Sequence, residues 1–137
     1  MPQFFKELIF KTSNKAFLDI TNHINSLISD YSVNNALINL SIMHTSCSLL
    51  IQENADPSVQ KDIKDFLDFM APEKEYFHNS EGPDDMPAHL KSLLTQTHLS
   101  LSVREKKLIL GTWQGIFLME HRVATHNRKV LVHILEV

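Results

Sequence analysis

The sequence predicts an α+β domain built on a largely antiparallel β-sheet or sandwich with about three helices. Segments in which apolar and polar residues alternate occur in runs, helical segments are few and bunched, and no glycine-rich βαβ signature is present. With 137 residues, 43% of them apolar and 21% charged, the chain suits one domain over residues 1–137.

The first third of the chain is predicted to form two strands, a helix and a third strand. Residues 5–10 and 16–18 are expected to pair as a hairpin that turns at Ser13 and Asn14. From Asp19, a candidate N-cap, apolar residues recur every three or four positions as far as Tyr31, which predicts an amphipathic helix. Alternation over residues 36–44 predicts a half-buried strand that ends at His44.

A strand over residues 47–52 is followed by the helix start Asp56-Pro57, an N-cap acceptor before a first-turn proline. The buried face of this helix is expected to be Val59, Ile63, Phe66, Leu67 and Met70. Residues 71–86 form a long aperiodic loop, which is usually functional. Pro87 then opens a helix with the apolar face Leu90, Leu93 and Leu94, and strands follow over residues 99–103, 108–110, 112–122 and 129–137.

Composition excludes several classes of function. The net charge of −3 gives no cationic field for nucleic acid or anionic lipid. The single cysteine, Cys47, excludes an intrachain disulfide, and no apolar run approaches the roughly 20 residues of a membrane span. We therefore expect a cytoplasmic protein, whose unusual feature is eight histidines beside three glycines.

The segment from His78 to His89 is dense in groups that bind divalent metals. It contains two histidines and the carboxylates of Glu81, Asp84 and Asp85 around a helix start. Imidazole and carboxylate ligands suit Zn, Mn or Fe. The alternative is that the acids cap the helix and the histidines are solvated.

The segment over residues 111–122 contains two of the three glycines and the only tryptophan. In strand parity Gln114, Glu120 and Arg122 share a face, and His121 points away from it. Glu120 is then a candidate metal ligand or general base and Arg122 a candidate phosphate-binding group. An exposed cross-strand ion pair is the alternative.

A third polar segment begins at His44, Thr45 and Ser46. Its hydroxyls are expected to bind a ligand, because no nucleophile-elbow or cysteine-protease signature surrounds them and Cys47 is expected to be a small buried residue. His23, His98, His126 and His133 lie outside these segments and are expected to be structural, His133 as a core histidine.

Together these segments resemble the YjbQ family, also called secondary thiamine-phosphate synthases. The resemblance rests on HTSCSLLIQENADP at residues 44–57, on HN at 78–79 with PDDMPAHLK at 83–91, and on LGTWQGIFLMEHR at 110–122. It covers essentially the whole chain. It implies a mixed α+β fold, a homotrimer, and a polar cleft near the subunit boundary with a metal site.

The resemblance places the family's polar positions on residues of all three segments. The metal ligands we infer are His44, His78 and His89, for a divalent ion such as Zn, Mg or Mn. The inferred substrate-binding residues are Thr45, Ser46, Asn54, Asp56, Gln114 and Arg122, and the inferred catalytic residues are Asp85, Glu120 and Arg122.

The activity that the resemblance implies joins hydroxymethylpyrimidine diphosphate and thiazole phosphate, with metal and Arg122 neutralising the departing diphosphate. The substrate is thus a phosphorylated small molecule, and the physiological one is left open because the family name calls the activity secondary. The alternative is a protein that binds metal or a small phosphorylated ligand without catalysis.

Overall fold

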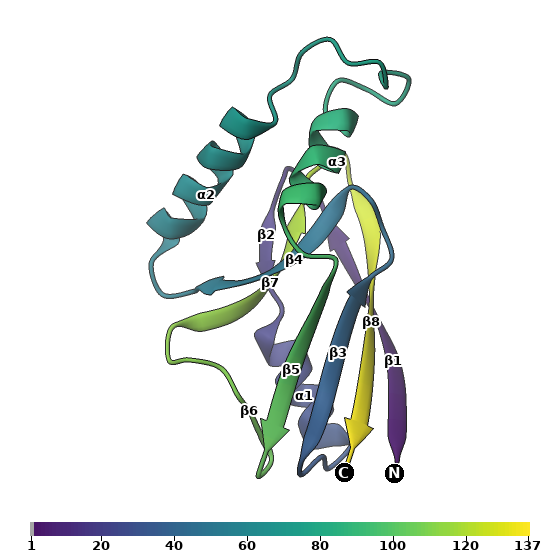
Figure 1. Cartoon of the computed structure of the whole chain (residues 1–137), viewed down its shortest axis with the longest axis vertical. Helices are drawn as coiled ribbons and strands as arrows, with labels where there is room; N and C mark the ends of the chain where they lie inside the picture. The colour runs from purple at the N-terminus through teal and green to yellow at the C-terminus, as the bar shows by residue number, and fades with distance from the viewer. Residues whose placement is uncertain (1) are drawn as a thin grey trace.

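The computed structural model describes residues 2–137, so only Met1 of the predicted domain lies outside the described residues. Figure 1 shows its helices and strands. In chain order they are β1 (Gln3–Thr12), β2 (Phe17–Asp19), α1 (Thr21–Asp30), β3 (Ala36–Ile42), β4 (Cys47–Glu53), α2 (Pro57–Met70), α3 (Asp85–Leu94), β5 (His98–Arg104), β6 (Lys107–Leu108), β7 (Gln114–Glu120) and β8 (His126–Glu136).

The strands form two sheets. A five-stranded sheet has the order β1-β8-β3-β5-β6, and a three-stranded sheet has the order β2-β7-β4. Each of these pairings is antiparallel. The predicted α+β class with an antiparallel sheet or sandwich is therefore confirmed.

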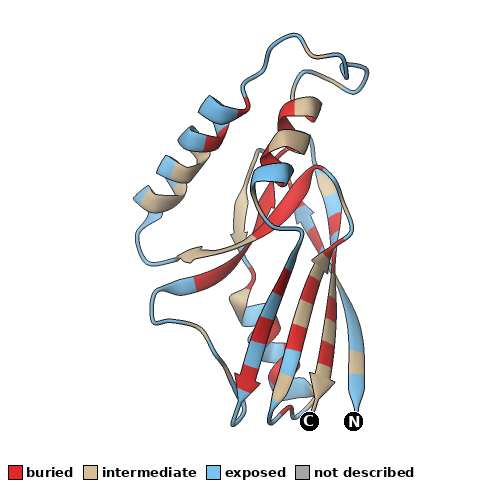
Figure 2. Cartoon of the chain, in the orientation of Figure 1, coloured by how far each residue is buried: buried red, intermediate tan, exposed pale blue. Residues whose placement is uncertain are grey.

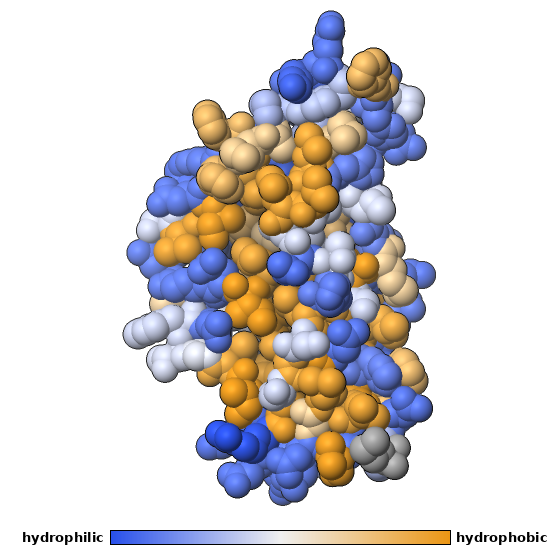
Figure 3. Space-filling view, viewed as in Figure 1, coloured by the Kyte–Doolittle hydropathy of each residue, from blue (hydrophilic) through white to orange (hydrophobic). Residues whose placement is uncertain are grey.

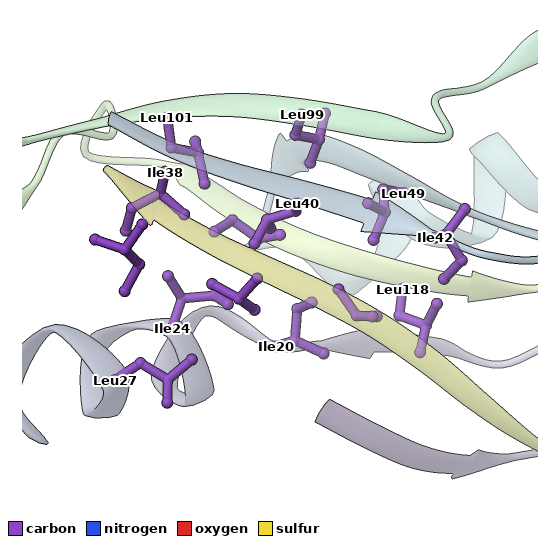
Figure 4. Packing of buried hydrophobic residues seen from close by; sticks show 14 of the residues in the cluster. Ile20, Ile24, Leu27, Ile38, Leu40, Ile42, Leu49, Leu99, Leu101 and Leu118 are labelled. Carbon is purple, nitrogen blue, oxygen red and sulfur yellow. The ribbon is translucent and has the colours of Figure 1, made fainter. Parts of the chain in front are cut away.

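The core lies between the two sheets and α1. Alternation along β3 and β5 buries Ile38, Leu40, Leu99 and Leu101 as predicted, and Ile24 of α1 packs into the same cluster (Figure 4). Leu40 is fully buried, so its truncation to alanine is expected to cost about 2–5 kcal/mol. None of the helices formed by residues 2–137 is long and apolar enough to cross a membrane.

The predicted N-terminal hairpin is wrong, although both of its strands exist. All ten residues of β1 pair with β8, and β2 pairs with β7 in the other sheet. The turn at Asn14 carries the chain between sheets, and its N–H and that of Lys15 donate to the carbonyls of Val123 and Arg122. Local alternation indicates a strand but does not select its partner, and β8 offers a longer match.

The predicted buried faces of α2 and α3 are also largely wrong, because most of their predicted residues are not buried in this single chain (Figure 2). Of α2 only Leu67 is buried, whereas Phe69 is 80% exposed. Phe69 lay outside the predicted face, whereas the predicted core residues that stand exposed are Phe66, Met70, Leu93 and Leu94. Figure 3 shows apolar side chains gathered on this part of the surface. An apolar stripe predicts that a face becomes covered, but not that the same chain covers it.

Several boundaries differ from the sequence prediction by a few residues. Helix α3 begins at Asp85, two residues before Pro87, and β8 begins at His126 inside the predicted turn. The predicted strand over 108–110 is reduced to Lys107–Leu108. The Asp56 cap is confirmed, because its carboxylate accepts a hydrogen bond from the Ser58 N–H at 2.9 Å.

Candidate metal centre

The first turns of α3 and the loop before it bring together His78, Asp85 and His89. One ligand atom from each of these residues lies within 4.8 Å of the others. Asp85 and His89 are four residues apart and so share one face of α3, which fixes their proximity. The Asp85 Oδ2 lies 2.6 Å from His78 Nε2 and 3.2 Å from His89 Nε2. The predicted grouping of two histidines and a carboxylate is thus present.

Asp85 is held as a carboxylate although it is only 2% exposed. Its burial favours the neutral acid, but the hydrogen bond with His78 and the charges of His89 and Arg122 outweigh burial and lower its pKa below the usual value. The Arg122 guanidinium donates from Nη1 to Asp85 Oδ1 at 2.7 Å. One carboxylate oxygen therefore faces the arginine and the other faces the two histidines.

His89 is oriented by a backbone carbonyl. Its Nδ1 lies 2.7 Å from the carbonyl oxygen of Thr45, in the turn before β4. A carbonyl oxygen accepts but cannot donate, so His89 carries a proton on Nδ1. In neutral His89 the lone pair is then on Nε2, the atom that faces Asp85.

Arg122 does not present a free guanidinium. Besides Asp85, it donates from Nη2 to the Glu81 carbonyl oxygen at 2.7 Å, and its side chain is 14% exposed. Its Nε lies 3.2 Å from Asp84 Oδ2 without forming a hydrogen bond, and it is a buried donor without a partner among residues 2–137. These contacts hold Asp85 and the loop, and the phosphate-binding role of Arg122 stays a prediction.

Glu120 is separated from the histidines and lies in the interior. It is fully buried, and its carboxylate accepts hydrogen bonds from Thr12 Oγ1, the Arg122 N–H and two nitrogens of Arg128, at 2.5–3.1 Å. Burial opposes its ionisation, but these bonds lower its pKa below the usual value. Both carboxylate oxygens of Glu120 already accept hydrogen bonds, which does not match the predicted role as a metal ligand or general base. Its full burial also does not match the alternative of an exposed ion pair with Arg122.

His44 and Ser46 lie near the buried pair of Glu120 and Arg128 rather than at the cluster of His78, Asp85 and His89. His44 Nε2 accepts a hydrogen bond from the Lys129 N–H at 2.9 Å, and partial burial and the charge of Arg128 lower its pKa. Ser46 Oγ accepts from Arg128 at 3.0 Å and is nearly buried. Thr45 is exposed and contributes its carbonyl. His44 is thus not brought to the other two predicted metal ligands.

The remaining predicted substrate-binding residues lie at the other end of the three-stranded sheet. Asn54 and Asp56 follow the end of β4, and Gln114 begins β7, whereas Thr45 and Ser46 precede β4. Seven residues of β4 separate the two groups, which is roughly 20 Å at about 3.3 Å per residue. Asp56 caps α2, and Gln114 accepts a hydrogen bond from the Gly111 N–H. One chain therefore does not gather all the predicted site residues.

Arg128 is an interior residue that was not among the predicted site or core residues. A signal existed, since Arg128 occupies the buried phase of β8 together with Val130, Val132 and Ile134. An arginine in an apolar phase requires a buried acid as its partner. His133, expected in the core, instead lies in the outward phase and stacks on Phe5 with ring centroids 4.1 Å apart.

His121 is a second interior group for which no role was predicted. It shares a hydrogen bond of 2.7 Å with Ser48 Oγ, and burial lowers its pKa to about 3, so it is neutral. Burial likewise raises the pKa of the neighbouring Cys47 thiol to about 12. Both residues are therefore inert parts of the interior, as expected for Cys47.

Comparisons with known proteins agree over nearly the whole chain. A family described as UPF0047 protein YjbQ-like matches residues 6–137. A UPF0047 protein of Synechocystis sp. is 42% identical over 129 residues, which is 93% of this chain and 88% of that protein. The YjbQ protein of Escherichia coli O157:H7 is 38% identical over 128 residues, or 92% and 93% of the two chains.

Solved structures show the same fold. A YjbQ/UPF0047 protein from Clostridium acetobutylicum has a TM-score of 0.87 at 35% identity, covering 95% of this chain and 99% of that one. A YbjQ-like protein of unknown function from Sulfolobus solfataricus has a TM-score of 0.91 and covers 99% of each chain. It is 22% identical, so this likeness bears on the fold alone.

Proposed function

The chain belongs to the UPF0047 family of YjbQ-like proteins, and from this premise we propose that it is a metal-assisted enzyme acting on a phosphorylated small molecule. The reaction we propose is the synthesis of thiamine phosphate that the resemblance of the sequence implies. The alternative is a protein that binds a metal or small phosphorylated ligand without catalysis.

One contact carries the metal part of the proposal. The Nδ1 proton of His89 is committed to the Thr45 carbonyl, so the lone pair of its Nε2 faces Asp85 Oδ2 at 3.2 Å. Two acceptors at this distance repel each other unless a positive charge is shared between them. A second proton on His89 or a bound cation supplies that charge. His78 adds a third possible metal-ligand atom within 4.8 Å, which favours a bound cation over a second proton.

The chain's own residues would hold and orient such an ion. His78, Asp85 and His89 form a mixed nitrogen and oxygen donor set that suits Zn or Mn, whereas Mg, which prefers oxygen ligands, fits two imidazoles poorly. Thr45 fixes the ring of His89, and Arg122 fixes the far oxygen of Asp85. When bound, a divalent ion neutralises negative charge that develops on phosphate oxygens.

The proposed reaction does not require a general base. The thiazole nitrogen attacks the methylene carbon of the pyrimidine diphosphate, a C–N bond forms, and the C–O bond breaks with its electron pair leaving on diphosphate. No proton is removed from the nitrogen, so only the leaving group needs neutralisation. This requirement is compatible with a Glu120 engaged in the interior and an Asp85 kept ionised by its neighbours.

Metal titration tests the first half of the proposal. We expect purified protein, after dialysis against EDTA, to bind Zn²⁺ or Mn²⁺ with one site per chain in calorimetry. His78→Ala and His89→Ala should each weaken binding by roughly tenfold or more. His98→Ala is the matched control, because His98 is exposed on β5 and lies outside the cluster. Equal affinity in all variants would contradict a site at these histidines.

Product analysis separates the two functions. With both thiamine precursors and the bound metal, thiamine phosphate should form in the wild type and in His98→Ala, and its formation should be lost in His89→Ala. Metal binding without product over long incubation would favour the non-catalytic alternative. Protein that binds no metal yet forms product would refute the metal-assisted mechanism.

We further propose that the chain works as a homotrimer. The exposed apolar faces of α2 and α3, including Phe69 and Leu93, support self-association. The distance between Asn54, Gln114 and the histidine cluster also favours it, because another copy is needed to bring the two groups together. Light scattering should give three times the chain mass of 15.7 kDa. Phe69→Glu and Leu93→Glu should each reduce the measured mass, whereas Phe5→Glu on β1 should leave it unchanged. A wild-type protein with the mass of one chain would contradict the trimer.

A further inference from the structure

A cavity of about 550 Å³ lies far from the histidine cluster, between α1 and the hairpin that joins β5 to β6. Figure 1 shows this hairpin at the lower end of the molecule and α3 at the upper end. The volume falls within the roughly 300–1,000 Å³ typical of pockets that hold small molecules. We call it the α1–β6 cavity.

The α1–β6 cavity has an apolar floor. Val33 is fully buried, Ile28 is nearly so, and Leu108 is half-buried. All three side chains belong to or adjoin the hydrophobic core, so the floor is firmly packed. Val33 and Ile28 have almost no accessible surface, and the half-buried Leu108 is the apolar side chain that a ligand in the cavity can cover.

The rim of the cavity is polar and positively charged. It is formed by Asn25, Ser29, Ser32, Lys106 and Lys107, and it contains no carboxylate. Among residues 2–137, neither lysine ammonium has an acidic side chain at ion-pair distance. Two uncompensated charges therefore stand beside hydroxyl and amide donors, in a chain whose net charge is −3.

The backbone at the rim is held in unusual conformations. Ser32, Glu105 and Lys106 have φ angles of 51°, 51° and 68°, in the left-handed region that favours glycine. Ser32 follows the end of α1, where its N–H donates to the Ser29 carbonyl, and Glu105 and Lys106 form the hairpin turn. These conformations are those of a two-residue hairpin turn and of a residue that ends a helix, and they fix the positions of the two walls of the cavity.

We propose that the α1–β6 cavity binds a small phosphate monoester, with its phosphate at Lys106 and Lys107 and its apolar body against Leu108. A phosphate dianion matches the two ammonium charges, and the hydroxyls of Ser29 and Ser32 can donate to its oxygens. The C-terminal end of α1 carries a partial negative charge, which the two lysines exceed. This site is independent of the metal centre.

The test uses phenyl phosphate as the probe, in an NMR titration of ¹⁵N-labelled full-length protein. Saturable shifts are expected at the amides of Ser29, Ser32 and Leu108. Inorganic phosphate, which lacks the apolar body, should bind at least threefold more weakly, and benzyl alcohol, which lacks the charge, should not saturate.

The double variant Lys106→Gln/Lys107→Gln should weaken phenyl phosphate binding at least tenfold. Lys6→Gln/Lys11→Gln removes the same charge from exposed positions on β1 and should leave the affinity within twofold. The spectrum of each variant reports its fold, and increased NaCl should weaken binding to the wild type. Absence of saturable shifts, shifts confined to residues near His78 and His89, or equal affinity in the two double variants would overturn the proposal.

Discussion

Asp85 and Glu120 are two buried carboxylates that lie on either side of Arg122, yet their surroundings differ in kind. Glu120 has Arg128, Thr12 and a backbone N–H around it, and all of these groups donate. Asp85 has an arginine on one oxygen and two histidines on the other, and His89 presents Nε2 to it because its Nδ1 is bonded to the Thr45 carbonyl. Both carboxyl groups have lowered pKa values.

The difference shows that burial and charge alone do not mark a functional carboxylate. Glu120 is complete within its own chain, because each oxygen already accepts hydrogen bonds from donors. Asp85 keeps an oxygen facing atoms that can themselves bind a cation. A complete set of donors stabilises the fold, whereas an incomplete one is available for a ligand.

The largest effect is expected from removing Arg128. Arg128→Met leaves the Glu120 carboxylate buried without its charge partner, which should lower the free energy of unfolding by about 3–5 kcal/mol. Urea denaturation measures it. The double variant Glu120→Gln/Arg128→Met should recover part of this loss, since no buried charge remains. A single variant as stable as the wild type would show that Glu120 is not held as we describe.

A smaller loss of stability but a large loss of metal affinity is expected at Asp85. Asp85→Asn should lower the free energy of unfolding by about 1–3 kcal/mol, because Arg122 keeps its bond to Glu81. Zinc affinity in calorimetry should fall roughly tenfold or more. Asp84→Asn is the control, since Asp84 also lies against Arg122 but does not contact the histidines. Equal zinc affinity in the two variants would remove the distinction between the neighbouring carboxylates.

The buried His121, next to Glu120 in the chain, should make the stability of the protein depend on pH. The pKa of His121 is lowered from 6.5 to about 3 in the folded chain. As pH falls below about 6.5, His121 therefore becomes protonated in the unfolded chain while it stays neutral in the folded chain, which favours unfolding. Stability should therefore fall between about pH 6.5 and pH 3, by up to about 1.4 kcal/mol per pH unit from this group. His121→Gln should reduce that slope and His98→Gln should not. Identical slopes in all three proteins would mean that His121 is not kept neutral by folding.

The smallest effect is expected from a pair of threonines that serve the two carboxylate regions differently. Thr12 donates its hydroxyl to Glu120, so Thr12→Val should cost about 0.5–1.5 kcal/mol in urea denaturation. Thr45 contributes only its carbonyl to His89, so Thr45→Val should change stability by less than about 0.5 kcal/mol and leave zinc affinity unchanged. A large effect at Thr45 would imply a role for its hydroxyl.

The fold was largely predictable because periodicity reports local burial. Alternation at Ile38, Leu40 and Leu101 identified core strands, and Asp56-Pro57 marked the start of α2. Strand partners were less accessible, since nothing near β1 in the sequence indicates that β8 is its partner. Leu93 and Phe66 belong to the predicted apolar stripes and are exposed, because a stripe does not state which surface covers it.

The histidine cluster was predictable because its members are close in sequence, in the first turns of one helix and the loop before it. His78, Asp85 and His89 lie within twelve residues. The role of Glu120 depends on Arg128, which reaches it across the connection between β7 and β8, and that of Arg122 depends on Glu81 in the loop before α3. Residue type alone could not tell a free guanidinium from an engaged one.

The position of Cys47 makes this chain a natural reporter of its own opening. Its thiol is fully buried and its pKa is raised to about 12, so a thiol-directed reagent at neutral pH finds almost no thiolate in the folded state. Modification must wait for an opening that exposes β4, and no other cysteine contributes a background. The rate at which a maleimide labels the chain therefore measures how often the three-stranded sheet opens at β4. Mass spectrometry can follow this labelling without any engineered probe.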